Sequence, residues 1–185
     1  YWRDLEATES AGVGPSLSAA RVASQTLALR EDKLAFYGIK SLGIEGLVNA
    51  KGANTQKRSD WSQGEGAYTD IAKAMTTLLS KGRIGRLTLV LSPDMLVQLE
   101  RIQPGTGVLE TQRIEKLLGS KIYMSISLEP GTAILVSAQP QYMDLVVGQD
   151  IRTAYTEAVE LNHHLRVLET AVVRVKAPDA IVVLK

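Results

Sequence analysis

One long amphipathic segment, residues 15–37, restricts the possible folds of this chain more than any other feature. Its apolar residues recur at spacings of three, four and seven, which is the period of one helix face: Leu17, Ala20, Ala23, Leu27 and Leu34. Pro15 fits the first helical turn, and Gly38 fits the left-handed position after the last turn. Such a helix is about 35 Å long. We expect other elements to pack along it.

The remainder alternates between helical and strand patterns. A polar, glycine-rich stretch, residues 49–66, is interpreted as an exposed loop in which Trp61 pins the chain to a neighbouring surface. Helices are predicted at 69–81, from Ser92-Pro93-Asp94 onward, and at 109–118. Strands are predicted at 86–92, 121–128, 133–137, 143–148, 163–175 and 180–184. The pattern predicts an α+β protein.

The composition excludes several classes of function. The chain has 185 residues, of which 45% are hydrophobic and 22% charged, as in ordinary globular domains. Its net charge of +1 gives no general attraction to nucleic acid or to an anionic membrane. It has no cysteine, which rules out disulfides and thiolate chemistry. No apolar run approaches the length of a membrane span, and no signal peptide is visible.

No pattern of residues points to catalysis. The phosphate-loop, GxSxG and HExxH motifs do not occur. His163 and His164 are adjacent on a predicted strand, so they should point to opposite faces and not share a metal ion. A surface or interface role is the favoured interpretation of both. Glu169 lies within an apolar strand, where an unpaired charge is costly, so we expect a structural carboxylate with a partner.

Four stretches resemble one family. They are "REDKLAFYGIKSLGIEGL", "LETQRIEKLLGSKIY", "DLVVGQDIRTAYTE" and "VLETAVVRVKAPDAIVVLK". In this order and spacing they resemble the encapsulins, shell proteins of nanocompartments that have also been described as linocin-type bacteriocins. Encapsulins are similar in fold to the Hong Kong phage-type major capsid protein of tailed viruses.

The resemblance implies a fold with two lobes. Residues 1–47 and 147–185 would form a peripheral lobe, which holds the spine helix 15–37 and a terminal sheet. Residues 48–146 would form an axial lobe. Gly38, Gly43 and Gly46 would be the hinge between the lobes, because glycine relaxes backbone steric limits. We expect the family's N-terminal arm and extended loop to be missing from this chain, which begins near the family's Trp-containing stretch.

The resemblance also implies a structural function without catalysis. Many copies would form an icosahedral shell in the cytoplasm and enclose cargo enzymes that are held by a terminal peptide. No membrane or nucleic acid would be bound. One alternative is the major capsid protein of a tailed phage or provirus, which packages DNA. A less favoured alternative is a hydrolase or bacteriocin.

Candidate site residues follow from the same resemblance. The stretch Gln103, Pro104, Gly105, Thr106 and Gly107 matches the family's five-fold pore rim, where small residues suit converging copies. Gln149, Asp150 and Ile151 match a segment near the groove for a cargo peptide, although a turn capped by Asp150 is an equally good interpretation. Some family members bind flavin beside a tryptophan, and Trp2 occupies a similar place; simple packing is favoured for it. We expect no other cofactor and no metal.

Overall fold

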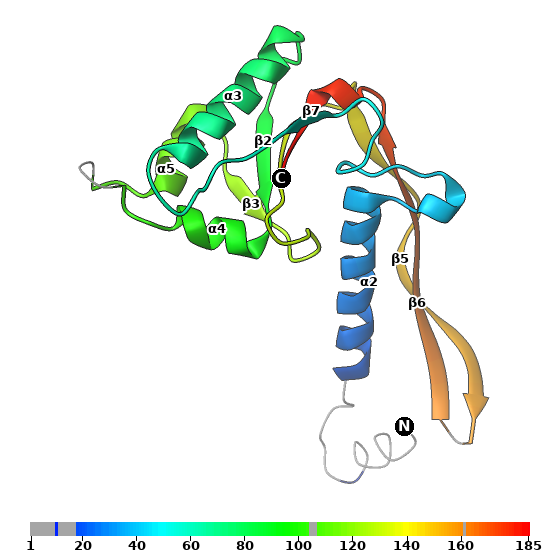
Figure 1. Ribbon diagram of the computed structural model, residues 1–185. Coiled ribbons are helices and arrows are strands. Elements are labelled where there is room, and N and C mark those ends of the chain that lie inside the picture. Colours follow the sequence, from blue (N-terminus) through cyan, green and yellow to red (C-terminus); the bar gives the residue numbers. More distant parts are fainter. Residues whose placement is uncertain (1–9, 11–17, 104–106, 161) are drawn as a thin grey trace. The chain divides into compact units, whose positions relative to one another are not determined.

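The structure is a computed structural model that describes Ser10 and residues 18–103, 107–160 and 162–185 (Figure 1). It confirms the α+β class. Tertiary contacts divide the chain into two compact units. The first unit comprises residues 1–31 and 146–172, and the second comprises residues 32–145 and 173–185. Pro15 and Leu17 of the predicted spine helix lie outside the described residues.

The second unit is built on a five-stranded sheet in the order β1-β7-β4-β2-β3. Strands β1 and β7 are parallel, as are β2 and β3, whereas β4 is antiparallel to both of its neighbours. The strands span Asn54–Gln56 (β1), Leu87–Leu91 (β2), Ile122–Met124 (β3), Ala133–Ser137 (β4) and Ile181–Leu184 (β7). Every residue of β4 and β7 is buried, which identifies the middle of the sheet as the core.

Each face of this sheet has its own apolar layer. One face packs against helices α3 (Gly66–Ser80), α4 (Pro93–Leu99) and α5 (Glu110–Leu118), where the buried faces of the helices meet alternate residues of β2, β4 and β7. The other face is covered by Phe36, Ala50 and Leu128. Figure 1 shows the three helices grouped around β2 and β3. Two covered faces explain why the central strands are continuously apolar and not alternating.

The final strand corrects the predicted terminal sheet. Residues 147–185 were expected to supply one sheet of the peripheral lobe, but β7 pairs with β1 and β4, both of which lie within 48–146. The physical reason is burial on both faces of Ile181–Leu184. A run of four apolar residues needs a sheet that is covered on both sides, and a two-stranded hairpin does not provide one.

The strand predicted at 121–128 is shorter in the structure and ends at Met124. Ser125 directs its hydroxyl to Asp32 Oδ2 at 2.7 Å, and its own backbone N–H donates to Leu91 O at 3.0 Å. The chain then turns, which leaves Ile126 exposed and buries Leu128. The alternation of apolar residues is present, but the last four residues of the predicted strand, 125–128, belong to a turn.

Helix α2 spans Ser18–Tyr37, within the predicted 15–37, and Phe36 is its one buried residue. Up to Arg30 the described helix is exposed apart from Leu27, which is half-buried; Val22 is 61% exposed. Of the predicted apolar stripe, Ala20 and Ala23 are exposed and Leu27 and Leu34 are half-buried. The large apolar residues that α2 does expose, Val22 and Leu29, lie outside that stripe, so the structure does not show the predicted apolar face.

The three glycines after α2 form a compact turn. Gly38 and Gly43 have positive φ angles of 66° and 68°. A Cβ on Gly46 would lie 2.4 Å from the backbone of Phe36 and Tyr37, so only glycine fits there. All three glycines lie inside the second unit, and the division between the units falls at Glu31 and Asp32. The structure gives the glycines a packing role, and a hinge at these positions stays a prediction.

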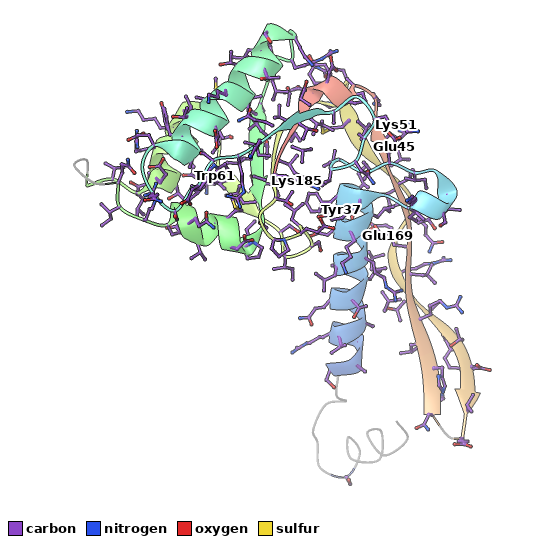
Figure 2. All side chains as sticks on the ribbon, in the orientation of Figure 1. Tyr37, Glu45, Lys51, Trp61, Glu169 and Lys185 are labelled. Carbon is purple, nitrogen blue, oxygen red and sulfur yellow. The ribbon has the colours of Figure 1, made fainter. Side chains whose placement is uncertain are left out.

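Trp61 pins its loop, as predicted (Figure 2). Its indole is fully buried and donates from Nε1 to Asp70 Oδ2 at 3.0 Å. The same oxygen accepts from the backbone N–H and the hydroxyl of Ser59 at 2.6 and 2.7 Å. Burial by itself raises the pKa of Asp70, but these hydrogen bonds together hold that pKa below its usual value. The carboxylate therefore fixes the loop against α3.

The first unit contains the hairpin formed by β5 (Met143–Val159) and β6 (Asn162–Val175), whose first and last residues reach into the second unit. These are the longest strands of the structure, at 17 and 14 residues. They correspond to the strands predicted at 143–148 and 163–175, the first of which extends much further than expected. No described helix combines the length and the apolar character that a membrane crossing needs.

Candidate functional site

The residues on either side of the segment predicted as a pore rim, 101–103 and 108–110, pair with each other as a short stem. Gln103 N–H donates to Val108 O at 2.9 Å, Glu110 N–H donates to Arg101 O at 3.0 Å, and Ile102 bridges Leu109. Pro104, Gly105 and Thr106 lie outside the described residues. Gly107 has a φ of 68°, which favours glycine at the end of the loop. Gln103 is buried, so of the two described rim residues only Gly107 is exposed.

The residues predicted for cargo docking lie on β5 but not on one face. Successive side chains of a strand point to opposite faces, so Gln149 and Ile151 share a face and Asp150 lies on the other. Asp150 Oδ1 accepts the N–H of Ile151 at 2.7 Å. The contact is local, but Asp150 lies inside β5, so the turn that the capping interpretation assumed is not found there. The structure thus separates Asp150 from the other two candidates.

Exposed apolar residues continue along the face of Gln149 and Ile151. Large apolar side chains at odd positions of β5 are 43–58% exposed: Leu145, Val147, Ile151, Tyr155 and Val159. Because successive side chains of a strand alternate, this face of β5 is mainly apolar, with Gln149, Thr153 and Glu157 between the apolar residues. An uncovered apolar strip of this length is characteristic of an interaction surface.

Glu169 adds a polar group to this strip. Gly148 lies against Thr170, so the next residues along the paired strands are Gln149 and Glu169. Glu169 is half-buried and makes no hydrogen bond or ion pair with the described residues. Gln149 Nε2 is buried and likewise lacks a partner among them. The predicted partner of Glu169 is therefore not found within the part of the chain that the structure describes.

An ion cluster closes the base of the hairpin. Arg174 binds Asp144 with two hydrogen bonds of 2.8 and 2.7 Å, and Lys176 Nζ lies 2.6 Å from Asp144 Oδ2. Lys176 Nζ also donates to Pro140 O at 2.7 Å. The hydrogen bonds from Arg174 and Lys176 hold the pKa of Asp144 well below its usual range. The cluster ties the two strands together where they enter the second unit.

The two histidines show no arrangement for catalysis among the described residues. Both are exposed on β6. The ring of His163 packs on Tyr155 with centroids 5.8 Å apart, and His164 O accepts from Thr156 Oγ1 at 2.9 Å. Trp2, the residue considered for flavin contact, lies outside the described residues.

Comparison with known proteins identifies the family. Residues 1–172 match the family model described as Linocin_M18, an encapsulating protein for peroxidase. The type 1 encapsulin shell protein EncA of Myxococcus xanthus is 40% identical over 185 residues, which is all of this chain and 64% of that protein. A diheme-cytochrome-encapsulin shell fusion protein of Kuenenia stuttgartiensis is 34% identical over 188 residues, covering all of this chain and 52% of the fusion. The chain thus spans less than two thirds of these relatives.

Solved structures agree on the fold. The virus-like particle from Pyrococcus furiosus superposes with a TM-score of 0.81 at 23% identity, over 92% of this chain and 69% of the other. The capsid of Myoviridae phage XM1 superposes with a TM-score of 0.73 at 12% identity, over 97% of this chain and 68% of the other. The predicted Hong Kong phage-type capsid fold is confirmed. With the family match, these findings show that the chain belongs to the encapsulin family of structural shell proteins and not to a family of enzymes.

Proposed function

We propose that many copies of this protein self-assemble into an icosahedral shell in the cytoplasm that encloses cargo enzymes. The observation that carries the proposal is the uncovered, mainly apolar face of β5 in a chain of the encapsulin family. A soluble monomer rarely leaves such long apolar strips exposed. Obligate contacts between copies bury roughly 2,000 Å² or more, and burial of this kind would cover the exposed apolar surface that cargo does not occupy.

The lobe arrangement is proposed on the same basis. Residues 48–146, completed by β7, would form the axial lobe, and residues 1–47 with the hairpin would form the peripheral lobe. Every residue of strands β4 and β7 in the five-stranded sheet is buried, which supports the axial lobe as a folding unit of its own. Copies of the axial lobe would meet around the symmetry axes of the shell.

Electron microscopy and sedimentation of the purified native protein test assembly. Closed particles of uniform diameter are expected. A monomer or dimer at every concentration would overturn the proposal. Nucleic acid extracted from the particles distinguishes the capsid alternative, because a DNA-packaging shell retains nuclease-protected DNA and a cargo compartment does not.

Cargo docking is proposed for the apolar strip of β5. The names of two relatives describe shell domains fused to a diheme cytochrome and to a ferritin-like protein, which supports a cargo that is physically attached to the shell. In this chain Gln149 and Ile151 would contact an extended peptide, with the Glu169 carboxylate offering a partner to a basic side chain or a backbone N–H. Asp150, on the other face, would not take part.

Loading of a peptide-tagged cargo into intact shells tests this assignment. Ile151→Ser should reduce the ratio of cargo to shell severalfold, because it removes apolar contact area without changing charge. Asp150→Ala is the matched control on the neighbouring residue and should load normally. The reverse result, with loading lost only in Asp150→Ala, would refute the choice of face.

A pore at the 103–107 loop is also proposed. The loop is short, and Gly107 with its positive φ leaves little side-chain bulk where copies would converge. Thr106→Asp should change the entry of small charged solutes into loaded shells without disrupting assembly. Unchanged permeability would count against a pore at this position.

A further inference from the structure

The stem of the 103–107 loop is anchored by side chains that lie far away in the sequence. Gln103, on the first arm of the stem, donates from Nε2 to Glu65 Oε1 at 2.7 Å. Arg101, two residues earlier, donates from Nη2 to Gly64 O at 2.7 Å. Both acceptors belong to the end of the loop that Trp61 and Asp70 fix against α3. The first arm is therefore attached to the segment that leads from that loop into α3.

Arg113 joins this anchor to the second arm. Its guanidinium binds Glu65 through two oxygens, at 3.1 Å from Nη1 to Oε1 and 2.9 Å from Nη2 to Oε2. Nη1 also lies 3.2 Å from Oε2 of Glu110, whose carboxylate is fully buried where the second arm enters α5. The guanidinium stacks 4.8 Å above the ring of Tyr68. Arg113 thus contacts Tyr68 on α3, Glu110 at the start of α5 and Glu65 in the loop that precedes α3.

Of the charged residues around the stem, Glu65 is one that can be substituted without leaving an unpaired charge in the interior. A buried carboxylate such as that of Glu110 requires a cation, so removing Arg113 would leave an unpaired charge in the interior. Glu65 is 54% exposed and can be removed without burying a charge. The hydrogen bonds from Arg113 lower the pKa of Glu65, which keeps it ionised and able to hold both Gln103 and Arg113.

We propose that Glu65 and Arg113 are positioning residues that hold the stem of the 103–107 loop in one place, and that this clamp sets which solutes pass the loop. The second half of this inference rests on the proposed pore function, whereas the first half concerns the second unit alone. Glu65 acts through other residues: its carboxylate contacts the first arm of the stem through Gln103 and, through Arg113, Glu110 at the end of the second arm.

Amide hydrogen exchange of assembled shells tests the clamp directly. Glu65→Ala should speed exchange at the stem amides of Gln103 and Glu110 about tenfold, because the charge-assisted hydrogen bonds that hold the stem are lost. The second unit as a whole should stay folded. Glu65→Gln keeps an acceptor for Gln103 and should give a smaller increase. Exchange in β4 should not change in either variant.

Glu100→Ala is the matched control for charge. Glu100 is exposed, directly precedes the stem and makes no hydrogen bond or ion pair with the described residues through its side chain. Its removal changes the local charge by the same amount as removal of Glu65. Stem exchange should stay within about twofold of the original protein.

Solute entry is measured on the same shells, with a fluorescent protein fused to the lumenal side and water-soluble quenchers of graded size. Faster stem exchange with a wider range of entering quenchers in Glu65→Ala supports the clamp and the pore. Faster stem exchange with unchanged entry supports the clamp and overturns the pore. Unchanged stem exchange in Glu65→Ala, or an equal increase in Glu100→Ala, overturns the clamp whatever the quenchers show.

Discussion

The buried hydrogen bond between Trp61 and Asp70 should be measurable as a coupling energy. The indole N–H lies 3.0 Å from Asp70 Oδ2, and the indole is fully buried. A hydrogen bond to a buried charged group contributes about 1.5–3 kcal/mol. Trp61→Phe removes the donor, and Asp70→Ala removes the acceptor. In the double variant the second substitution should therefore cost about 1.5–3 kcal/mol less than it does alone.

The single variants should differ for reasons visible in the structure. Asp70→Ala also deprives the N–H and hydroxyl of Ser59 of their acceptor, so it should destabilise more than the Trp61 coupling alone. Trp61→Phe leaves a small cavity and removes one of the three donors to Asp70 Oδ2, while the two donors of Ser59 remain. Both extra terms cancel in the cycle, which is why the coupling and not a single variant is the quantity to measure.

Guanidinium unfolding followed by far-UV circular dichroism provides the four free energies. All samples must share one protein concentration, because association between copies adds to apparent stability. Asp60→Ala is the control: its exposed carboxylate accepts from Ser62 in the same loop, and its loss should barely move the midpoint. A Trp61–Asp70 coupling below about 0.5 kcal/mol would refute the claim that this carboxylate fixes the loop.

Three further outcomes are expected. Gly46→Ala should lower the melting temperature far more than Gly43→Ala, because its Cβ would meet backbone at 2.4 Å whereas that of Gly43 meets nothing within 4 Å; equal losses would contradict this. The lowered pKa of Asp144 means that its ion pairs stabilise the hairpin at neutral pH and are lost only as the pH falls through that low pKa. The difference in amide exchange between the original protein and Asp144→Asn should therefore persist at about pH 4. If this difference disappears by about pH 5, the ion pairs are weaker than the structure indicates. Leu128→Ala should cost about 2–5 kcal/mol of subunit stability and Ile126→Ala under about 0.5, as unfolding titrations of dissociated subunits can verify.

Local patterns predicted most elements of the second unit. The apolar face of α3, the Ser92-Pro93-Asp94 start of α4 and Gly119 after α5 each carry their information within a few residues, and each element forms as expected. The buried Trp61 was identifiable because it is the one large apolar residue in a polar loop. Such signals depend on sequence neighbours, so a single chain suffices to interpret them.

Features set by distant residues could not be predicted in this way. The pairing of β7 with β1 depends on a register between Asn54 and Val182, for which the sequence carries no local sign. The end of β3 depends on Asp32, which accepts from Ser125. The clamp on the 103–107 stem joins Glu65 to Arg113 across the sheet-covering helices. Charged residues of this kind look like ordinary surface residues until the fold brings them together.

The position of β7 has a consequence for the timing of synthesis. Its four residues lie between β1 and β4, so the sheet lacks its middle until Ile181–Leu184 have left the ribosome. A nascent chain that stops before this point exposes one edge of β1 and one of β4, and has no finished lobe to offer a neighbour. Chains truncated before Ile181 should therefore remain unassembled and be excluded from growing particles.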